Sequence, residues 1–159
     1  MPDVFDLTPA EASAELARLT EIHRGGPVPT AAAKAVIDLI ENERLGVNAE
    51  ETGGYLKDKL LELQEKHPLI GDVRGMGLMQ AIELVEDRNS KTPATAATLR
   101  VMEAARESRV LIGRGGLDGN VIRISPPLNI GRTDVDNFIG ALDASLTKAA
   151  TPALQGAGR

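Results

Sequence analysis

The sequence contains no cysteine and no tryptophan, and its only aromatic residues are Phe5, Tyr55 and Phe138. Without cysteine, the chain can form neither a disulfide nor a thiolate metal site. With so few aromatic rings, the core must be built from aliphatic side chains, and apolar residues make up 42% of the 159 positions. We therefore expect one domain whose core consists of Leu, Ile, Val and Ala.

Two further absences exclude classes of partner. The net charge of −5 argues against a nucleic-acid surface, which requires an excess of basic side chains. The sequence has no apolar run long enough to span a membrane, and its N-terminus lacks a basic-then-apolar signal. We expect a soluble, cytoplasmic protein with no nucleic-acid or membrane partner. His23 and His67 belong to no metal-ligand spacing, so we expect both at the surface and no metal site.

The first half of the chain begins with a dense helix-start signal. Thr8, Pro9 and Glu11 have the order of an N-cap, a first helical residue and a capping box. Apolar residues then repeat on one face, which predicts a short helix to about Ile22. The segment Gly-Gly-Pro-Val-Pro at 25–29 interrupts the pattern and is the best candidate for a junction.

Two longer helices are predicted after this break. Thr30 would cap the first, which runs to about Arg44. Asn48, with Glu51 three residues later, would open the second, which ends before Pro68. The residues expected to face the core are Ala33, Val36, Ile37 and Ile40 in the first helix and Leu56, Leu60 and Leu63 in the second.

The second half mixes extended and helical segments. Residues 70–77 and 78–85 are predicted to be strands, and Gly75 and Gly77 to form a turn or a close backbone contact. Arg74 beside Asp72 is predicted to form a structural ion pair. One face of the second strand would carry Met79, Ala81 and Leu84, with Ile82 on the opposite face.

A helix is predicted from Pro93 to about Glu107, followed by a short strand at 110–112 and a flexible glycine-rich loop at 113–119. Thr133 and Asp136 would box a last helix, and residues 150–159 are expected to be a disordered tail. The apolar seam of that helix is Val135, Phe138, Ile139, Leu142 and Leu146. The predicted fold class is α+β, with a small, mostly antiparallel sheet covered by helices and an added N-terminal helix.

One arginine interrupts the most strand-like segment. Arg123 lies between β-branched residues at 121–124, and Ser-Pro-Pro at 125–127 ends the pairing because proline has no N–H to donate. A guanidinium stays charged, so an arginine buried there requires an anionic partner. That partner is either an acidic side chain of the fold or the carboxylate of a ligand, and residue types alone favour the structural ion pair.

Three sequence blocks resemble the C-terminal part of the class III pyridoxal-phosphate-dependent aminotransferases, the group that contains ornithine, 4-aminobutyrate and alanine–glyoxylate 2 type enzymes. The blocks are Gly25-Gly26-Pro27-Val28 leading into residues 31–38, residues 67–79, and residues 120–128. The resemblance assigns residues 25–149 to the family's small domain. Residues 1–24 do not resemble the family and are predicted to be a separate helical leader.

The resemblance implies a fold, a reaction and a role for Arg123. The small domain would be a sheet covered by helices, joined to a large cofactor domain by the helix from Thr30 to Arg44. The complete enzyme would use pyridoxal phosphate to transfer an amino group from an amino acid or amine to a 2-oxo acid or aldehyde. In many members the arginine of the last block holds the substrate α-carboxylate, and this role carries onto Arg123.

The sequence also departs from the family. The family's Schiff-base lysine lies upstream of the Gly-Gly block, but no lysine precedes Gly25 here, and the first is Lys34. The family usually reads Thr-Phe-Gly-Gly-Asn-Pro, whose threonine binds the cofactor phosphate across the dimer; this chain has His23-Arg24-Gly25-Gly26-Pro27. We therefore expect no catalytic or cofactor-binding residue in the chain alone, and no activity from it.

Three hypotheses remain open. The chain could be one half of a split aminotransferase, completed by a separate large-domain chain. It could instead be a non-catalytic, oligomeric binding module that uses Arg123 to hold a carboxylate, or a functionless truncated remnant. Its expected partners are a second copy of itself or the large-domain chain, because a small domain without its large domain exposes apolar surface.

Overall fold

The computed structural model describes residues 8–22 and 26–150. The expected tail therefore lies outside the described residues, apart from Ala150, as does His23. The chain divides after Arg44 into two units, which are described separately. No described helix is both long and apolar enough to cross a membrane.

The first unit contains two helices, α1 (Pro9–Ile22) and α2 (Pro27–Asn42). The predicted capping box of α1 is confirmed: the Thr8 amide donates to the Glu11 carboxylate at 2.8 Å, and the Glu11 amide donates to Thr8 Oγ1 at 3.4 Å. Helix α2 begins earlier than predicted, with Gly26 at the N-cap. Pro27 fits the first helical position because its missing N–H would have no partner there, so the assignment of Thr30 as the cap was wrong.

The face of α2 that was predicted to be buried is not buried. The helix contains no buried residue, and the exposed fractions of Val36 and Ile40 are 56% and 36%. The prediction failed because apolar periodicity identifies a face, whereas burial also requires a neighbouring element to cover it.

The second unit contains a four-stranded antiparallel sheet with strand order β1-β2-β4-β3. The strands are β1 (Ile70–Met76), β2 (Met79–Leu84), β3 (Gly113–Gly115) and β4 (Val121–Ile124). The predicted strand at 110–112 was wrong, since β3 lies in the glycine segment that was predicted to be a flexible loop. Glycine has low strand propensity, and β3 forms because β4 offers it a pairing edge.

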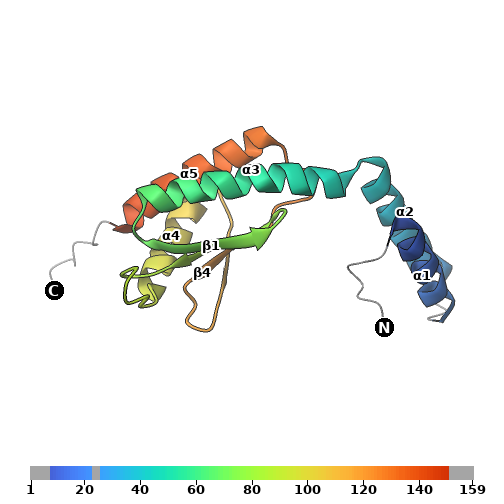
Figure 1. Cartoon of the computed structure of the whole chain (residues 1–159), viewed down its shortest axis with the longest axis horizontal. Coiled ribbons are helices and arrows are strands. Elements are labelled where there is room, and N and C mark those ends of the chain that lie inside the picture. The colour runs from blue at the N-terminus through green and yellow to red at the C-terminus, as the bar shows by residue number, and fades with distance from the viewer. Residues whose placement is uncertain (1–7, 23–25, 151–159) are drawn as a thin grey trace. The chain divides into compact units, whose positions relative to one another are not determined.

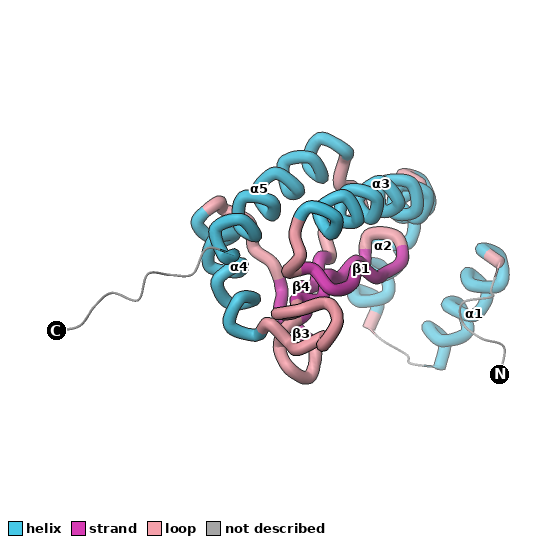
Figure 2. The backbone as a smooth tube through the Cα atoms, turned by 60° about the vertical axis from the view of Figure 1, so that its left-hand side comes forward, coloured by secondary structure: helices cyan, strands magenta, loops and turns pink. Residues whose placement is uncertain are grey.

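Three helices pack together with this sheet: α3 (Leu45–Lys66), α4 (Thr95–Glu107) and α5 (Arg132–Ala150). Figures 1 and 2 show the long helices α3 and α5 lying along the same side of the strands. The core between the layers is aliphatic, as predicted, and its most deeply buried side chains are Leu56, Leu60, Ile70, Ile82, Leu84, Ile122, Leu142 and Leu146. The α+β fold class is therefore confirmed.

The pleat of β2 differs from the prediction. Gln80, Ile82 and Leu84 face the helices, whereas Met79 is 74% exposed on the opposite face. Ile82 and Leu84 therefore share one face, and Met79 and Ala81 share the other. Only Leu84 was assigned to the wrong face, because residues three apart, such as Ala81 and Leu84, point to opposite faces of a strand.

Asp143 of α5 and Arg88 of the loop after β2 both bind the C-terminal end of α3, and sequence reasoning missed both contacts. His67 is buried, contrary to prediction, and its Nε2 lies 2.6 Å from the carboxylate of Asp143 on α5. Lys66 donates to the same carboxylate at 2.6 Å. The hydrogen bond from Lys66 has the larger effect in lowering the pKa of Asp143, and the one from His67 adds to it.

Arg88, in the loop after β2, donates to the backbone carbonyls of Gln64, His67 and Ile70.

Helix α5 begins with a different cap from the one predicted. The Asp134 carboxylate accepts a hydrogen bond from the Gly131 amide at 3.4 Å. Asp136, which was assigned to a capping box with Thr133, instead accepts a 2.5 Å hydrogen bond from the Tyr55 hydroxyl of α3. Asp136 therefore links two helices, a role that only their proximity reveals.

Candidate functional site

Arg123 lies on β4, directly opposite Ala81 of β2 and Gly113 of β3. Its neighbours Ile122 and Ile124 are buried against the helices, so the alternation of the strand directs Arg123 to the other, open face of the sheet. The side chain is exposed, and no residue in the described part of the chain forms an ion pair or hydrogen bond with it. Of the two partners left open for Arg123, an acidic side chain of the fold is not found among the described residues.

The open face also carries Arg74, whose charge is balanced. Its guanidinium lies 2.6 Å from Asp72 and 2.7 Å from Glu83, which confirms the predicted pair and adds a second acid. The hydrogen bonds that Arg74 donates to Asp72 and, with a smaller effect, to Glu83 raise the pKa of Arg74. Arg74 and Arg123 thus lie on strands either side of β2, but Arg123 alone of the two has no acidic partner among the described residues.

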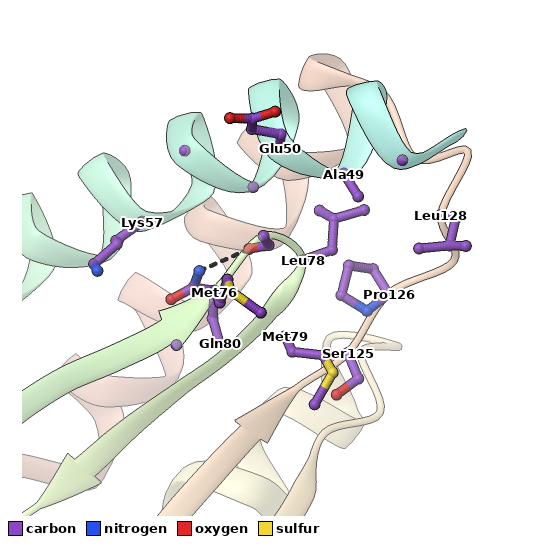
Figure 3. Close-up of a pocket in the computed structure, with 15 residues that line it drawn as sticks. Ala49, Glu50, Lys57, Met76, Leu78, Met79, Gln80, Ser125, Pro126 and Leu128 are labelled. Atoms are coloured by element: carbon purple, nitrogen blue, oxygen red, sulfur yellow. Dashed lines mark hydrogen bonds between the residues drawn. The ribbon is translucent and has the colours of Figure 1, made fainter. Parts of the chain in front are cut away.

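Two cavities meet at the segment that follows Arg123. The smaller, of about 130 Å³, is lined by Arg123 together with Leu111, Phe138 and other apolar residues. The larger, of about 650 Å³, lies between α3 and the β1–β2 turn (Figure 3). Ser125 and Pro126 line both cavities, so this segment is the wall that they share.

Glycine shapes the wall of the larger cavity on both sides. A Cβ atom at Gly53 of α3 would lie 2.1 Å from the carbonyl carbon of Gly77, so the helix and the turn are in backbone contact. Gly77 itself has a φ of 51°, which favours glycine, and the φ of Gly75 is 144°. The predicted close contact at the 75–77 segment is confirmed, and its partner is Gly53.

An asparagine of α3 holds the other end of this wall. The Asn48 side-chain amide donates to the carbonyl of Leu128 at 2.7 Å and to that of Ile130 at 3.1 Å. The Thr52 hydroxyl donates to Asn48 Oδ1 at 2.9 Å, which fixes the orientation of the amide. Asn48 was predicted only to open the helix, but α3 begins at Leu45 and Asn48 anchors the segment after Pro127.

Charged groups are sparse in the larger cavity. Glu50 and Lys57 of α3 line it, and Gln80 donates from Nε2 to the Gly77 carbonyl at 2.7 Å (Figure 3). Gln80 Oε1 is buried and has no hydrogen-bond partner within residues 8–22 and 26–150. Among the described residues, no three His, Asp or Glu side chains cluster as metal ligands would.

Comparison with known proteins identifies the family. The class-III aminotransferase family model matches residues 9–146. The chain belongs to this family. The match begins at residue 9, within the segment that was predicted to be an unrelated leader, and the boundary of the small domain at residue 25 stays a prediction.

Individual relatives agree with this assignment. The chain is 53% identical over 124 residues to the Arabidopsis thaliana protein "Alanine--glyoxylate aminotransferase 2 homolog 2, mitochondrial", covering 78% of this chain and 26% of the relative. It is 42% identical to the isoleucine 2-epimerase of Lentilactobacillus buchneri, covering 77% of this chain and 27% of that protein. The chain therefore spans about a quarter of the length of the curated relatives it matches.

Solved structures show the same fold. A Bacillus anthracis aminotransferase superposes with a TM-score of 0.72 at 34% identity, covering 76% of this chain and 28% of that chain. An Arthrobacter phospholyase in complex with phosphoethanolamine superposes with a TM-score of 0.73 at 37% identity, covering 76% and 29%. The relatives thus include an aminotransferase, an epimerase and a lyase.

The lining of the larger cavity does not fit pyridoxal phosphate, the family's cofactor. Pyridoxal phosphate requires an amine for its carbonyl carbon and a cluster of N–H donors or cations for its phosphate. The larger cavity brings one described lysine, Lys57, together with Glu50, apolar side chains and closely packed glycines. These residues supply no cluster of N–H donors or cations that could hold the phosphate.

Proposed function

We propose that this chain is the small, substrate-facing domain of a class III pyridoxal-phosphate enzyme, and that Arg123 binds the carboxylate of the substrate. In the complete enzyme, an amino group would pass from an amino acid or amine to a 2-oxo acid or aldehyde. The observation that carries this proposal is the exposed side chain of Arg123, which has no partner among the described residues and lies in a sequence block typical of the family.

The chemistry of the site supports a carboxylate ligand. A guanidinium offers two parallel N–H donors, which match the two oxygens of a carboxylate. Arg123 also lines the smaller cavity, together with the apolar residues Leu111 and Pro126. Arg74, the other arginine of the open face, is already paired with Asp72 and Glu83, so Arg123 is the better anion site.

The isolated domain should bind carboxylates only weakly. One charge-assisted contact contributes about 1.5–3 kcal/mol, whereas a millimolar complex requires roughly 4 kcal/mol. We expect propionate to shift the backbone amide resonances of the residues around Arg123, such as Gly113, with a millimolar or weaker Kd, and the uncharged analogue propionamide to have no effect. Arg123→Ala should abolish the propionate response, and a response that survives this substitution would contradict the assignment.

Arg123→Ala should leave the fold intact. Because Arg123 is exposed and unpaired within the described chain, its removal should change the free energy of unfolding by less than about 0.5 kcal/mol. A buried arginine with an acidic partner would instead leave a stranded charge and cost about 3–5 kcal/mol. A thermal melt of Arg123→Ala distinguishes a ligand-binding role from a structural one. A large fall in Tm would show that Arg123 stabilises the fold.

The chain by itself should not turn over substrate. The lining of the larger cavity does not fit the cofactor, so we expect no 2-oxo acid product after mixing the chain with pyridoxal phosphate and an amino donor. Activity would require the cofactor domain, whether it lies on the same polypeptide or on a separate chain. Clear product formation by the chain alone would refute this part of the proposal.

Exposed apolar side chains support association with such a chain or with a second copy. Met76 and Met79 are 82% and 74% exposed at the β1–β2 turn, and Val28 of α2 is 78% exposed. Burying such residues is favourable, and exposed patches mark interaction sites. We expect an oligomer by size-exclusion chromatography with light scattering, and a changed oligomeric state or solubility after removal of residues 1–24. A monodisperse monomer in both forms would count against association.

A further inference from the structure

Strand β3 consists of two glycines on the face that carries Arg123, with Arg114 between them. Gly113 pairs with Arg123 and Gly115 with Val121, so positions 113 and 115 both lie on the open face. Neither glycine has a positive φ, so backbone conformation does not require glycine at either position. The reason for glycine must therefore be sought in what lies above the strand.

The side chain of Arg123 lies above these glycines. A Cβ atom at Gly115 would lie 3.0 Å from Arg123 Cδ and 3.6 Å from Cγ. A Cβ atom at Gly113 would lie 3.7 Å from Arg123 Cβ, which is an ordinary van der Waals distance. The stem of the arginine therefore runs diagonally across β3 from Gly113 toward Gly115, through space that a side chain at 115 would partly fill.

The alternative direction for Arg123 leads to the acidic side chains of the open face. On the other flank of β4 lies Ala81 of β2, and beyond it Arg74 of β1. Glu83 lies diagonally across from Arg123 on β2, a separation that long side chains span. If Arg123 were displaced from β3, its guanidinium would approach Glu83, which already pairs with Arg74. Arg123 would then pair with Glu83 and would no longer be available to a ligand.

We infer that Gly115 positions Arg123 for its ligand by letting the arginine stem lie flat on β3, away from Glu83. A Cβ atom at Gly115 would come within 3.0 Å of the stem, whereas one at Gly113 would make only an ordinary contact. This inference rests on the proposed function for its consequence, carboxylate binding. Its structural content, the direction of the Arg123 side chain, can be measured without any ligand.

Gly115→Ala tests the inference, and Gly113→Ala is the matched control. Both substitutions add one methyl group to the same strand, and both are compatible with the backbone. The side-chain Nε–Hε resonance of Arg123 should be recorded in each variant, assigned by its loss in Arg123→Lys. We expect Gly115→Ala to shift this resonance and to weaken propionate binding roughly threefold to tenfold, and Gly113→Ala to change neither.

A second variant tests whether a displaced Arg123 pairs with Glu83. Adding Glu83→Gln to Gly115→Ala removes the competing charge, so propionate affinity should return toward that of the unsubstituted chain. A merely structural effect of the methyl group would not be rescued in this way. Failure of the rescue, with Gly115→Ala still weakening binding, would overturn the role of Glu83.

The outcomes separate this inference from the proposed function. If the unsubstituted chain ignores propionate, the proposed function fails, while the ligand-free resonances of the two alanine variants still decide the positioning. If propionate binds through Arg123 but Gly115→Ala leaves both resonance and affinity unchanged, the positioning inference is overturned. Equal effects of Gly113→Ala and Gly115→Ala would also overturn it, because the measured clearances differ.

Discussion

Helices α2 and α3 follow each other in the chain, yet their burial is opposite to what their composition suggests. Helix α2 is rich in Ala, Val, Ile and Leu, but none of its residues is buried. Helix α3 carries many charged residues and two central glycines, and it supplies Leu56, Leu60 and Leu63 to the core. The amount of apolar sequence in a helix therefore does not decide its burial, because burial depends on which elements pack against it.

The largest expected effect contrasts one leucine from each helix. Leu60 of α3 is fully buried, whereas Leu39 of α2 is 49% exposed. Leu60→Ala should lower the free energy of unfolding by about 2–5 kcal/mol because it leaves a cavity. Leu39→Ala makes the same chemical change and should cost less than about 0.5 kcal/mol. Urea unfolding of both variants measures the difference, and similar losses would mean that α2 is covered in solution.

A second pair of substitutions, at Gly53 and Gly54, tests the contact between α3 and the β1–β2 turn. Gly53 and Gly54 are adjacent, but a Cβ atom at Gly53 would collide with the Gly77 backbone, whereas one at Gly54 would meet nothing within 4 Å. Gly53→Ala should destabilise the fold by about 1–3 kcal/mol through overpacking. Gly54→Ala should stabilise it by about 0.5–1 kcal/mol because alanine favours helix. Opposite shifts in Tm would confirm the contact, and shifts of the same sign would refute it.

A smaller effect concerns the junction of α3 with α5. The pKa of Asp143 is lowered in the folded state by Lys66 and His67, so the ionised carboxylate stabilises the fold above the pKa of the unfolded chain. Asp143→Asn should cost about 1–2 kcal/mol at neutral pH. Its cost relative to the unsubstituted chain should shrink as the pH falls through the lowered pKa. The check is denaturant unfolding at a series of pH values, and a cost that does not change with pH would show that the charge contributes nothing.

The predictions that succeeded rested on short-range patterns. The capping box at Thr8 and Glu11, the leucine stripe of α3 and the apolar seam of α5 depend on residues within a few turns of one another. The pairing of Arg74 with Asp72 joins side chains on the same face of one strand. In each case the physical cause lies within one element, so the sequence contains it completely.

The failures involve partners that are distant along the chain. His67 was assigned to the surface, but it is buried because Asp143 of α5 lies beside it. Strand β3 was assigned to a loop, since its glycines have no strand preference until β4 provides an edge. The residue types favoured a structural ion pair for Arg123, because a β-branched segment does not reveal which face of its sheet the helices cover.

The sequence by itself therefore determined the family, the order of the helices and the aliphatic character of the core, because periodicity, capping and local motifs are properties of neighbouring residues. Only the tertiary structure decided which face of β4 is covered, and so that Arg123 is exposed while its neighbours are buried. It also decided that Gly53 is in contact with Gly77 and that Gly115 lies beneath Arg123. The sequence does not show what lies above a glycine, and at Gly53 and Gly115 the need for glycine arises because a distant backbone or a long side chain approaches closely.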